Sequence, residues 1–112
     1  MNNVYLVGRI TKDINLIEEK DLSKSYITIA IPRSHKNDDG EYTADFVDCQ
    51  LWNELAVNTS KYCKKGDLVG IRGKLKTYIQ DVNEKKEKKM IVDVEKISFL
   101  AKSQIKEESQ DP

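Results

Sequence analysis

The stretch DFVDCQLWNE, residues 45–54, reads as a β-strand whose two faces differ in chemistry. Side chains alternate between the two faces of a strand, so every second residue points the same way. One face is apolar and typical of a buried core: Val47, Cys49 and Leu51. The other face mixes two large aromatic rings with polar side chains: Phe46, Asp48, Gln50 and Trp52. Neither a dry core nor an inert surface favours this mixture, so the second face is a candidate contact surface.

Four further segments show a similar alternation of apolar and polar residues. We predict strands at residues 3–11, 25–35, 67–79 and 90–100, which makes five with the opening stretch, and a short helix at 53–66. Pro32 is expected to mark a strand end or an edge, and residues 80–89 to form a polar, mobile hairpin tip. Five strands with one helix between the third and the fourth predict an all-β fold with one short helix, an OB-type five-stranded barrel.

The alternation also predicts which side chains form the core. The first two strands are expected to bury Val4, Leu6, Ile10, Ile27, Ile29 and Ile31. The fourth strand is expected to direct Val69, Ile71, Leu75 and Thr77 inward, with Gly73 among them. In the last strand Val92 and Val94 point inward, and a change of phase then brings in Ile97 and Phe99.

Length and composition limit the class of protein. A chain of 112 residues can form one domain but not two, and 34% of the residues are charged with a formal net charge of zero. No apolar run is long enough to span a membrane, and the first residues do not resemble a signal peptide. We expect a domain at residues 1–101, a disordered tail at 102–112, and no membrane partner.

The residues that support catalysis or metal binding are scarce. His35 is the single histidine, and Cys49 and Cys63 are the only cysteines, so a Cys/His metal site cannot be assembled. We interpret both cysteines as small, reduced core residues. The sequence holds no arrangement for acid–base, nucleophilic or nucleotide chemistry, so we predict neither an enzyme nor a bound cofactor.

A second predicted strand also has a face of basic and aromatic side chains. Along the fourth predicted strand, the side chains opposite the core are Arg72, Lys74, Lys76 and Tyr78. Aromatic rings beside a basic track suit single-stranded nucleic acid, because bases stack on rings while cations follow the phosphates. Taken singly, each feature has a plainer interpretation: Trp52 and Phe46 as packing residues, and the basic run as a solvated strand face.

The chain resembles the bacterial single-stranded DNA-binding protein family from about Asn3 to Leu100. The resemblance rests, in order, on NVYLVGRITKD, IAIPRS, DGEYTADFVDCQLWNELA and YCKKGDLVGIRGKLKT. It implies an OB fold and sequence-independent binding of single-stranded DNA in replication, repair or recombination. It also implies a homotetramer, with a dimer as the fallback, paired through the first strand at residues 4–10.

The resemblance also places site residues on this sequence. The family's stacking aromatics fall on Trp52, Phe46 and His35, and its basic residues on Arg72, Lys74 and Lys76. We include Arg33, from the matching IAIPRS segment, and Tyr78, which stands near the position of a further aromatic.

The resemblance is weakest at the end of the chain. The family's Gly/Pro/Gln-rich linker and acidic tip are missing from the sequence, which ends in Glu-Ser-Gln-Asp-Pro and leaves recruitment of other proteins by that route in doubt. A cytoplasmic protein of a bacterium, a phage or a mobile element is expected. The alternative function is that of an OB-fold adaptor, related to primosome components, that acts mainly through protein contacts.

Overall fold

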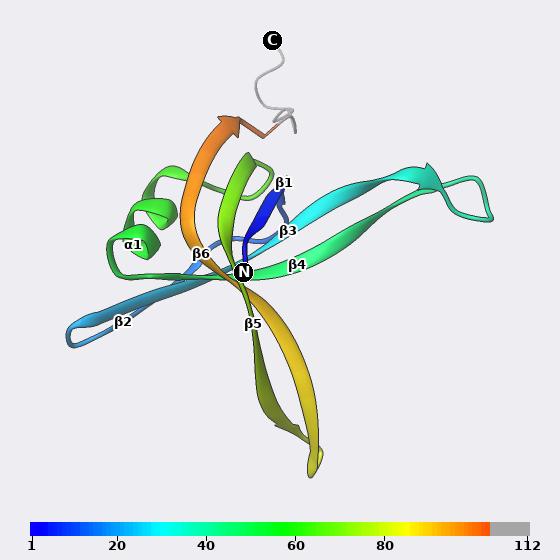
Figure 1. The fold of residues 1–112 in the computed structure, drawn as a ribbon. Helices are drawn as coiled ribbons and strands as arrows, with labels where there is room; N and C mark the ends of the chain where they lie inside the picture. The colour runs from blue at the N-terminus through cyan, green and yellow to red at the C-terminus, as the bar shows by residue number, and fades with distance from the viewer. Residues whose placement is uncertain (104–112) are drawn as a thin grey trace.

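The computed structural model describes residues 1–103, and Figure 1 shows their arrangement. Within this part of the chain the elements are β1 (Val4–Ile10), β2 (Asn15–Glu19), β3 (Leu22–Lys36), β4 (Tyr42–Trp52), α1 (Asn53–Tyr62), β5 (Leu68–Val82) and β6 (Lys85–Ala101). The predicted fold, mostly β with one short helix between the third and fourth expected strands, is confirmed. The expectation of a disordered tail falls, from residue 104 onward, outside the described residues.

Five of the strands form a closed ring of hydrogen-bonded pairs. The sheet order is β1-β5-β6-β4-β3-β2, and an additional pairing joins β1 to β3. Two contacts in the ring are short: β1 meets β3 at Arg9 and Ile10, and β4 meets β6, in parallel, at Cys49 and Gln50. The ring therefore encloses one core, although its strands differ greatly in length.

The structure has a sixth strand that the sequence pattern did not predict. β2 pairs with the beginning of β3 and lies at the outer end of the sheet. Its sequence, NLIEE, ends in two exposed carboxylates and has no regular alternation. The turn that follows has Lys20 at φ 40, without the Gly or Asn that usually marks such a turn. A short edge strand with this composition resembles a charged loop when it is read alone.

The core contains the residues that the alternation predicts for the first three expected strands. Ile29, Cys49 and Leu51 are fully buried, and Ala56 of α1 packs against them. Burial raises the pKa of the Cys49 thiol to about 12, with a smaller contribution from the nearby Asp48 carboxylate. Cys49 is thus an unreactive core residue, because only the thiolate is a good nucleophile. Cys63 is free and half-buried beside the core.

The β3–β4 and β5–β6 hairpins extend beyond the ring as arms, and Figure 1 shows them projecting from the centre. β3 continues through Pro32 to Lys36, so a strand end at this proline is wrong. The alternative, an edge, is confirmed, because β3 pairs with β1 only at Ile29 and Ala30 and with β4 alone at Pro32. β5 and β6 stay paired to a two-residue turn, where Asn83 and Glu84 have φ 51 and φ 66. Residues 80–89 therefore form the expected polar hairpin tip, with paired strand on both sides of the turn. Paired positive φ values suit a tight hairpin because their twist matches that of the strands.

The arms explain why part of the predicted core is exposed. Leu75 is 43% exposed and Thr77 is also exposed, because the β5–β6 arm leaves the ring and has no core beneath it. The Asn2 side chain fixes the base of this arm: its Nδ2 donates to the Leu75 carbonyl and its Oδ1 accepts from the Leu75 N–H, both at 2.9 Å. Phe99, also expected inward, is 49% exposed.

A bulge marks the point where β5 and β6 pass from the ring to the arm. Arg72 pairs with Lys96 and Gly73 pairs with Val94, so Glu95 is an extra residue in β6. The predicted change of phase is thereby confirmed for Ile97, which packs on the core in the other register after the buried Val92 and Val94, but not for Phe99, which is exposed. A bulge bends a strand and redirects its side chains.

We predict that Gly73→Ala destabilises the protein by about 1–3 kcal/mol, because overpacking at a rigid site costs that much. A Cβ at Gly73 would lie 2.3 Å from the Asp93 carbonyl oxygen, which is backbone and cannot turn away. Gly70→Ala is the control, since its Cβ meets Leu100 and Val7 at 3.5 and 4.0 Å. Urea midpoints at equal protein concentration measure the difference, and equal midpoints for the two variants would contradict the prediction.

Candidate nucleic-acid interface

The mixed face of β4 is joined to β3 by side-chain hydrogen bonds. β3 and β4 are antiparallel, with Tyr26 opposite Gln50 and Thr28 opposite Asp48. Gln50 Nε2 donates to the Tyr26 hydroxyl at 3.1 Å, and Thr28 Oγ1 donates to Asp48 Oδ1 at 2.8 Å. Gln50 and Asp48 of β4 are therefore each hydrogen-bonded to a hydroxyl group of β3, on the solvent-accessible side of the sheet away from the core.

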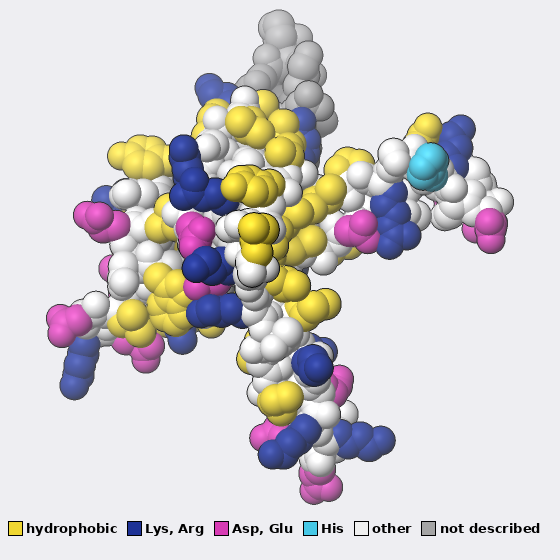
Figure 2. Space-filling view, viewed as in Figure 1, with side chains coloured by type: hydrophobic (Ala, Val, Ile, Leu, Met, Phe, Trp, Pro, Cys, Tyr) yellow, Lys and Arg dark blue, Asp and Glu magenta, His cyan; other side chains and the backbone are white. Residues whose placement is uncertain are grey.

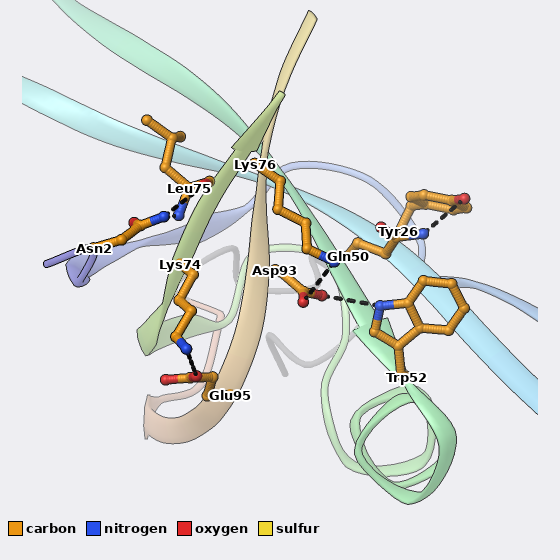
Figure 3. A network of polar contacts seen from close by, with 9 residues as sticks. All are labelled: Asn2, Tyr26, Gln50, Trp52, Lys74, Leu75, Lys76, Asp93 and Glu95. Carbon is orange, nitrogen blue, oxygen red and sulfur yellow. Dashed lines mark hydrogen bonds and ion pairs between the residues drawn. The ribbon is translucent and has the colours of Figure 1, made fainter. Parts of the chain in front are cut away.

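Asp93 of β6 lies at the centre of this surface and connects its two halves. β6 runs between β4 and β5, so Asp93 is beside Gln50 on one side and beside Lys74 on the other. Trp52 Nε1 donates to Asp93 Oδ1 at 2.9 Å, and Lys76 Nζ lies 3.1 Å from Asp93 Oδ2 (Figure 3). One carboxylate thus holds both the indole from β4 and an ammonium group from β5.

Carboxylates also accompany the rest of the basic track. Lys74 Nζ is 3.7 Å from Glu95 Oε2, and Arg72 Nε is 3.9 Å from Glu95 Oε1. The side chains of Arg72, Lys74 and Lys76 remain about half exposed, at 47–55%. Three cations against two carboxylates leave one positive charge, and Figure 2 shows basic and acidic side chains interleaved over the middle of the molecule.

A groove of ≈ 390 Å³ crosses the face between its aromatic and basic parts. Its lining comprises Tyr26, Gln50, Lys76, Thr77, Tyr78, Gln80 and Ile91. Tyr26 is 39% exposed and Tyr78 is 45% exposed, so both rings offer surface for a flat ligand group to pack on. The groove therefore combines two tyrosine rings, side-chain amides and an ammonium group.

The other predicted site residues lie toward the β3–β4 arm. Phe46 is 67% exposed and precedes Trp52 by six residues on the same face, a separation of about 20 Å along a strand. Arg33 donates from Nε and Nη2 to Asp45 Oδ1, at 3.1 and 2.6 Å, and this hydrogen bonding holds the pKa of Asp45 below its ordinary value. His35 is exposed and lines a second, shallow groove with Arg33.

The structure therefore brings together five of the eight predicted residues. Those five are Trp52, Arg72, Lys74, Lys76 and Tyr78, while Arg33 and His35 lie on the arm and Phe46 lies on β4 between the two groups. Four further residues of the face were not predicted as site residues: Tyr26, Gln50, Asp93 and Glu95. The alternation had placed Gln50 on an outward face, but nothing in the sequence pairs Asp93 or Glu95 with the basic track.

The chemistry of this face is that of noncovalent contact through rings, amides and charges. Within residues 1–103, no group of three or more His, Cys, Asp or Glu side chains could hold a metal ion. No helix in that part of the chain is long and apolar enough to cross a membrane.

Comparison with known proteins finds similar sequences over most of the chain. A model of the single-strand binding protein family matches residues 1–100. The chain is 47% identical to single-stranded DNA-binding protein B of Bacillus subtilis (strain 168) over 77 residues. These residues make up 68% of each of the two chains. The chain is 41% identical, over 78 residues, to single-stranded DNA-binding proteins 1 and 2 of Streptococcus pyogenes serotype M18. Those matches cover 69% of this chain but only 60% and 48% of the two relatives.

A solved structure supports the fold. The small single-stranded DNA-binding protein from Streptomyces coelicolor superposes with a TM-score of 0.69, over 87% of this chain and 92% of that one. The two sequences are 18% identical, so this likeness concerns the architecture alone.

The hydrogen bond between Trp52 and Asp93 yields a prediction about stability. Trp52→Phe keeps an aromatic ring but loses the N–H donor, so we expect a loss of about 1 kcal/mol in the free energy of unfolding. Phe46→Leu is the control, because Phe46 lies on the same strand face and is largely exposed. Urea unfolding of both variants provides the comparison, and a Phe46→Leu loss as large as that of Trp52→Phe would refute the assigned role of the bond.

Proposed function

The chain belongs to the single-strand binding protein family, and from this premise we propose that it binds single-stranded DNA, without catalysis and without sequence preference, on the face around Asp93. The observation that carries the proposal is the close arrangement of rings and cations there. Trp52 and Lys76 contact the same carboxylate, and Tyr26 and Tyr78 line the adjoining groove. Single-stranded DNA requires such a surface, because its bases are free to stack while its phosphates need positive charge.

Stacking is expected to supply most of the affinity. A base on an aromatic ring contributes about 1–3 kcal/mol, whereas an exposed ion pair contributes about 0–1. The basic side chains of β5 would attract and align the phosphates along the strand. We propose that all eight predicted residues contact one DNA strand along a single path. Phe46, Arg33 and His35 would extend this path along the β3–β4 arm.

The cellular role proposed is protection of single-stranded DNA in the cytoplasm during replication, repair or recombination. The family and the names of the relatives, which are single-stranded DNA-binding proteins, support this proposal. The adaptor hypothesis receives no support from the comparisons. If the protein were mainly an adaptor, oligonucleotides would bind weakly and would leave the Trp52 emission unchanged.

A titration with oligo(dT) of graded length tests the proposal. Trp52 is the only tryptophan, so its fluorescence reports this position directly, and we expect quenching that saturates at the binding stoichiometry. The triple variant Arg72→Ala, Lys74→Ala, Lys76→Ala should bind more weakly. The slope of log K against log salt should also be less steep for this variant, by about 0.7 for each lost phosphate contact.

The matched control removes three cations from the tip of the β5–β6 arm: Lys85→Ala, Lys86→Ala and Lys88→Ala. If the control flattens the salt dependence and the β5 variant does not, the phosphate path follows the tip of the arm. If neither oligonucleotide binding nor quenching is found with the native protein, the proposed function is wrong.

We further propose that the protein assembles as a homotetramer, with a dimer as the fallback, through β1. Its pairing with β3 is confined to Arg9 and Ile10, so residues 4–8 present a second edge without a strand partner in the described chain. Tyr5 and Val7 on this strand are 73% and 52% exposed. An exposed apolar edge strand is suited to pairing with another chain.

Light scattering at micromolar protein concentration is expected to give four copies. Val7→Lys should reduce the mass, because it places a charge in the proposed contact. Ile79→Lys is the control, since Ile79 is 61% exposed on the β5–β6 arm. A monomeric native protein, or equal masses for the two variants, would contradict assembly through β1.

A further inference from the structure

We propose that Asp93 and Glu95 limit the affinity for single-stranded DNA by occupying the cations that phosphates must reach. The inference rests on the proposed function of the same face. It assigns to two acidic residues of β6 the role of internal competitors, which the phosphates of the strand have to displace.

The geometry puts a carboxylate on every basic side chain of the track. Asp93 contacts Lys76 at 3.1 Å, and Glu95 lies 3.7 Å from Lys74 and 3.9 Å from Arg72. Both acidic side chains are less exposed than the cations they face, at 24% and 38% against 47–55%. The cations are thus accessible to a ligand, while the carboxylates lie closer to the sheet beneath them.

The backbone keeps these carboxylates in place. Glu95 is the extra residue of the β6 bulge, and the Asp93 carbonyl lies so close to Gly73 that a Cβ there would be 2.3 Å away. Bulges redirect side chains at functional surfaces. Strand register therefore fixes the backbone of both acidic residues beside β5, so their carboxylates stay near the basic track even when phosphate displaces them from the cations.

The strength of these ion pairs fits a competitor that phosphate can displace. Pairs this exposed contribute little individually, because water and salt screen them. A displaced carboxylate would nevertheless remain within a few ångströms of the incoming phosphate and would repel it. The cost is therefore paid on each binding event, and it should be largest at low ionic strength, where screening is weakest.

A different role for the same carboxylates predicts the opposite result. If they mainly hold Trp52 and the lysines in position for DNA, their loss should weaken binding. Asp93→Asn separates the two roles, because the amide oxygen can still accept the Trp52 N–H while the negative charge is gone. Glu95→Gln likewise keeps the length of the side chain and removes only the charge.

The experiment measures oligo(dT) affinity for Asp93→Asn, Glu95→Gln and the double variant, at about 0.1 M and about 1 M salt. The screening length falls from about 10 Å to about 3 Å between these conditions. At the lower salt we expect each single variant to bind up to about fivefold more tightly, and the double variant more tightly still. At the higher salt the differences should largely disappear. Glu18→Gln, an exposed carboxylate on β2, controls for the change in net charge.

Unchanged or weaker binding by both single variants at the lower salt would overturn the proposal, as would an equal gain in Glu18→Gln. Urea midpoints verify that each variant is folded. The β5 triple variant separates the possible failures. If that variant binds DNA as the native protein does, the basic track itself is wrong and the inference falls with it. If it loses affinity while neither Asp93→Asn nor Glu95→Gln gains any, only the inference fails.

Discussion

The close approach of β5 and β6 at Gly73 is the constraint on which the shape of this protein depends. Both strands belong to the closed ring at one end and to a projecting arm at the other (Figure 1). They can change course together because Gly73 lets the Asp93 carbonyl come close and because Glu95 adds a residue to one strand only. The same feature sets Asp93 and Glu95 opposite the basic side chains of β5.

Trp52 shows how one side chain can serve the fold and a ligand together. Its indole is half-buried and its N–H donates to Asp93, so part of the ring belongs to the structure. The sequence had left packing and base stacking as alternatives for this residue. The geometry fits both, because a fixed ring at the edge of a groove loses little conformational entropy when a base packs on it.

The charge distribution is compatible with the surface that we propose for nucleic acid on a chain of zero net charge. The basic track retains one positive charge after its two carboxylates are counted. Binding to a surface so nearly neutral would depend on rings more than on charge. The exposed rings are those of Tyr26 on β3, Phe46 on β4 and Tyr78 on β5. Because carboxylates neutralise most of the positive charge of the track, electrostatic attraction to a bound strand would be weak, and the strand would exchange readily.

The alternation of side chains was enough to predict which face of most ring strands is buried. The alternation of Ile27 and Ile29, or of Cys49 and Leu51, is local and survives in any fold that gives these strands one core. It also placed Phe46 and Trp52 together on an outward face. Only the tertiary structure decided where that core ends, and so Leu75 is exposed on an arm while Val69 is buried in the ring.

The tertiary structure also decided which side chains meet. Trp52 and Asp93 are 41 residues apart and touch only because β6 lies between β4 and β5. Strand order, register and bulges arise from pairing between distant segments, and a period of two carries no record of them. The alternation therefore predicted a basic track with rings beside it, whereas the carboxylates that accompany each cation became apparent only in the folded chain.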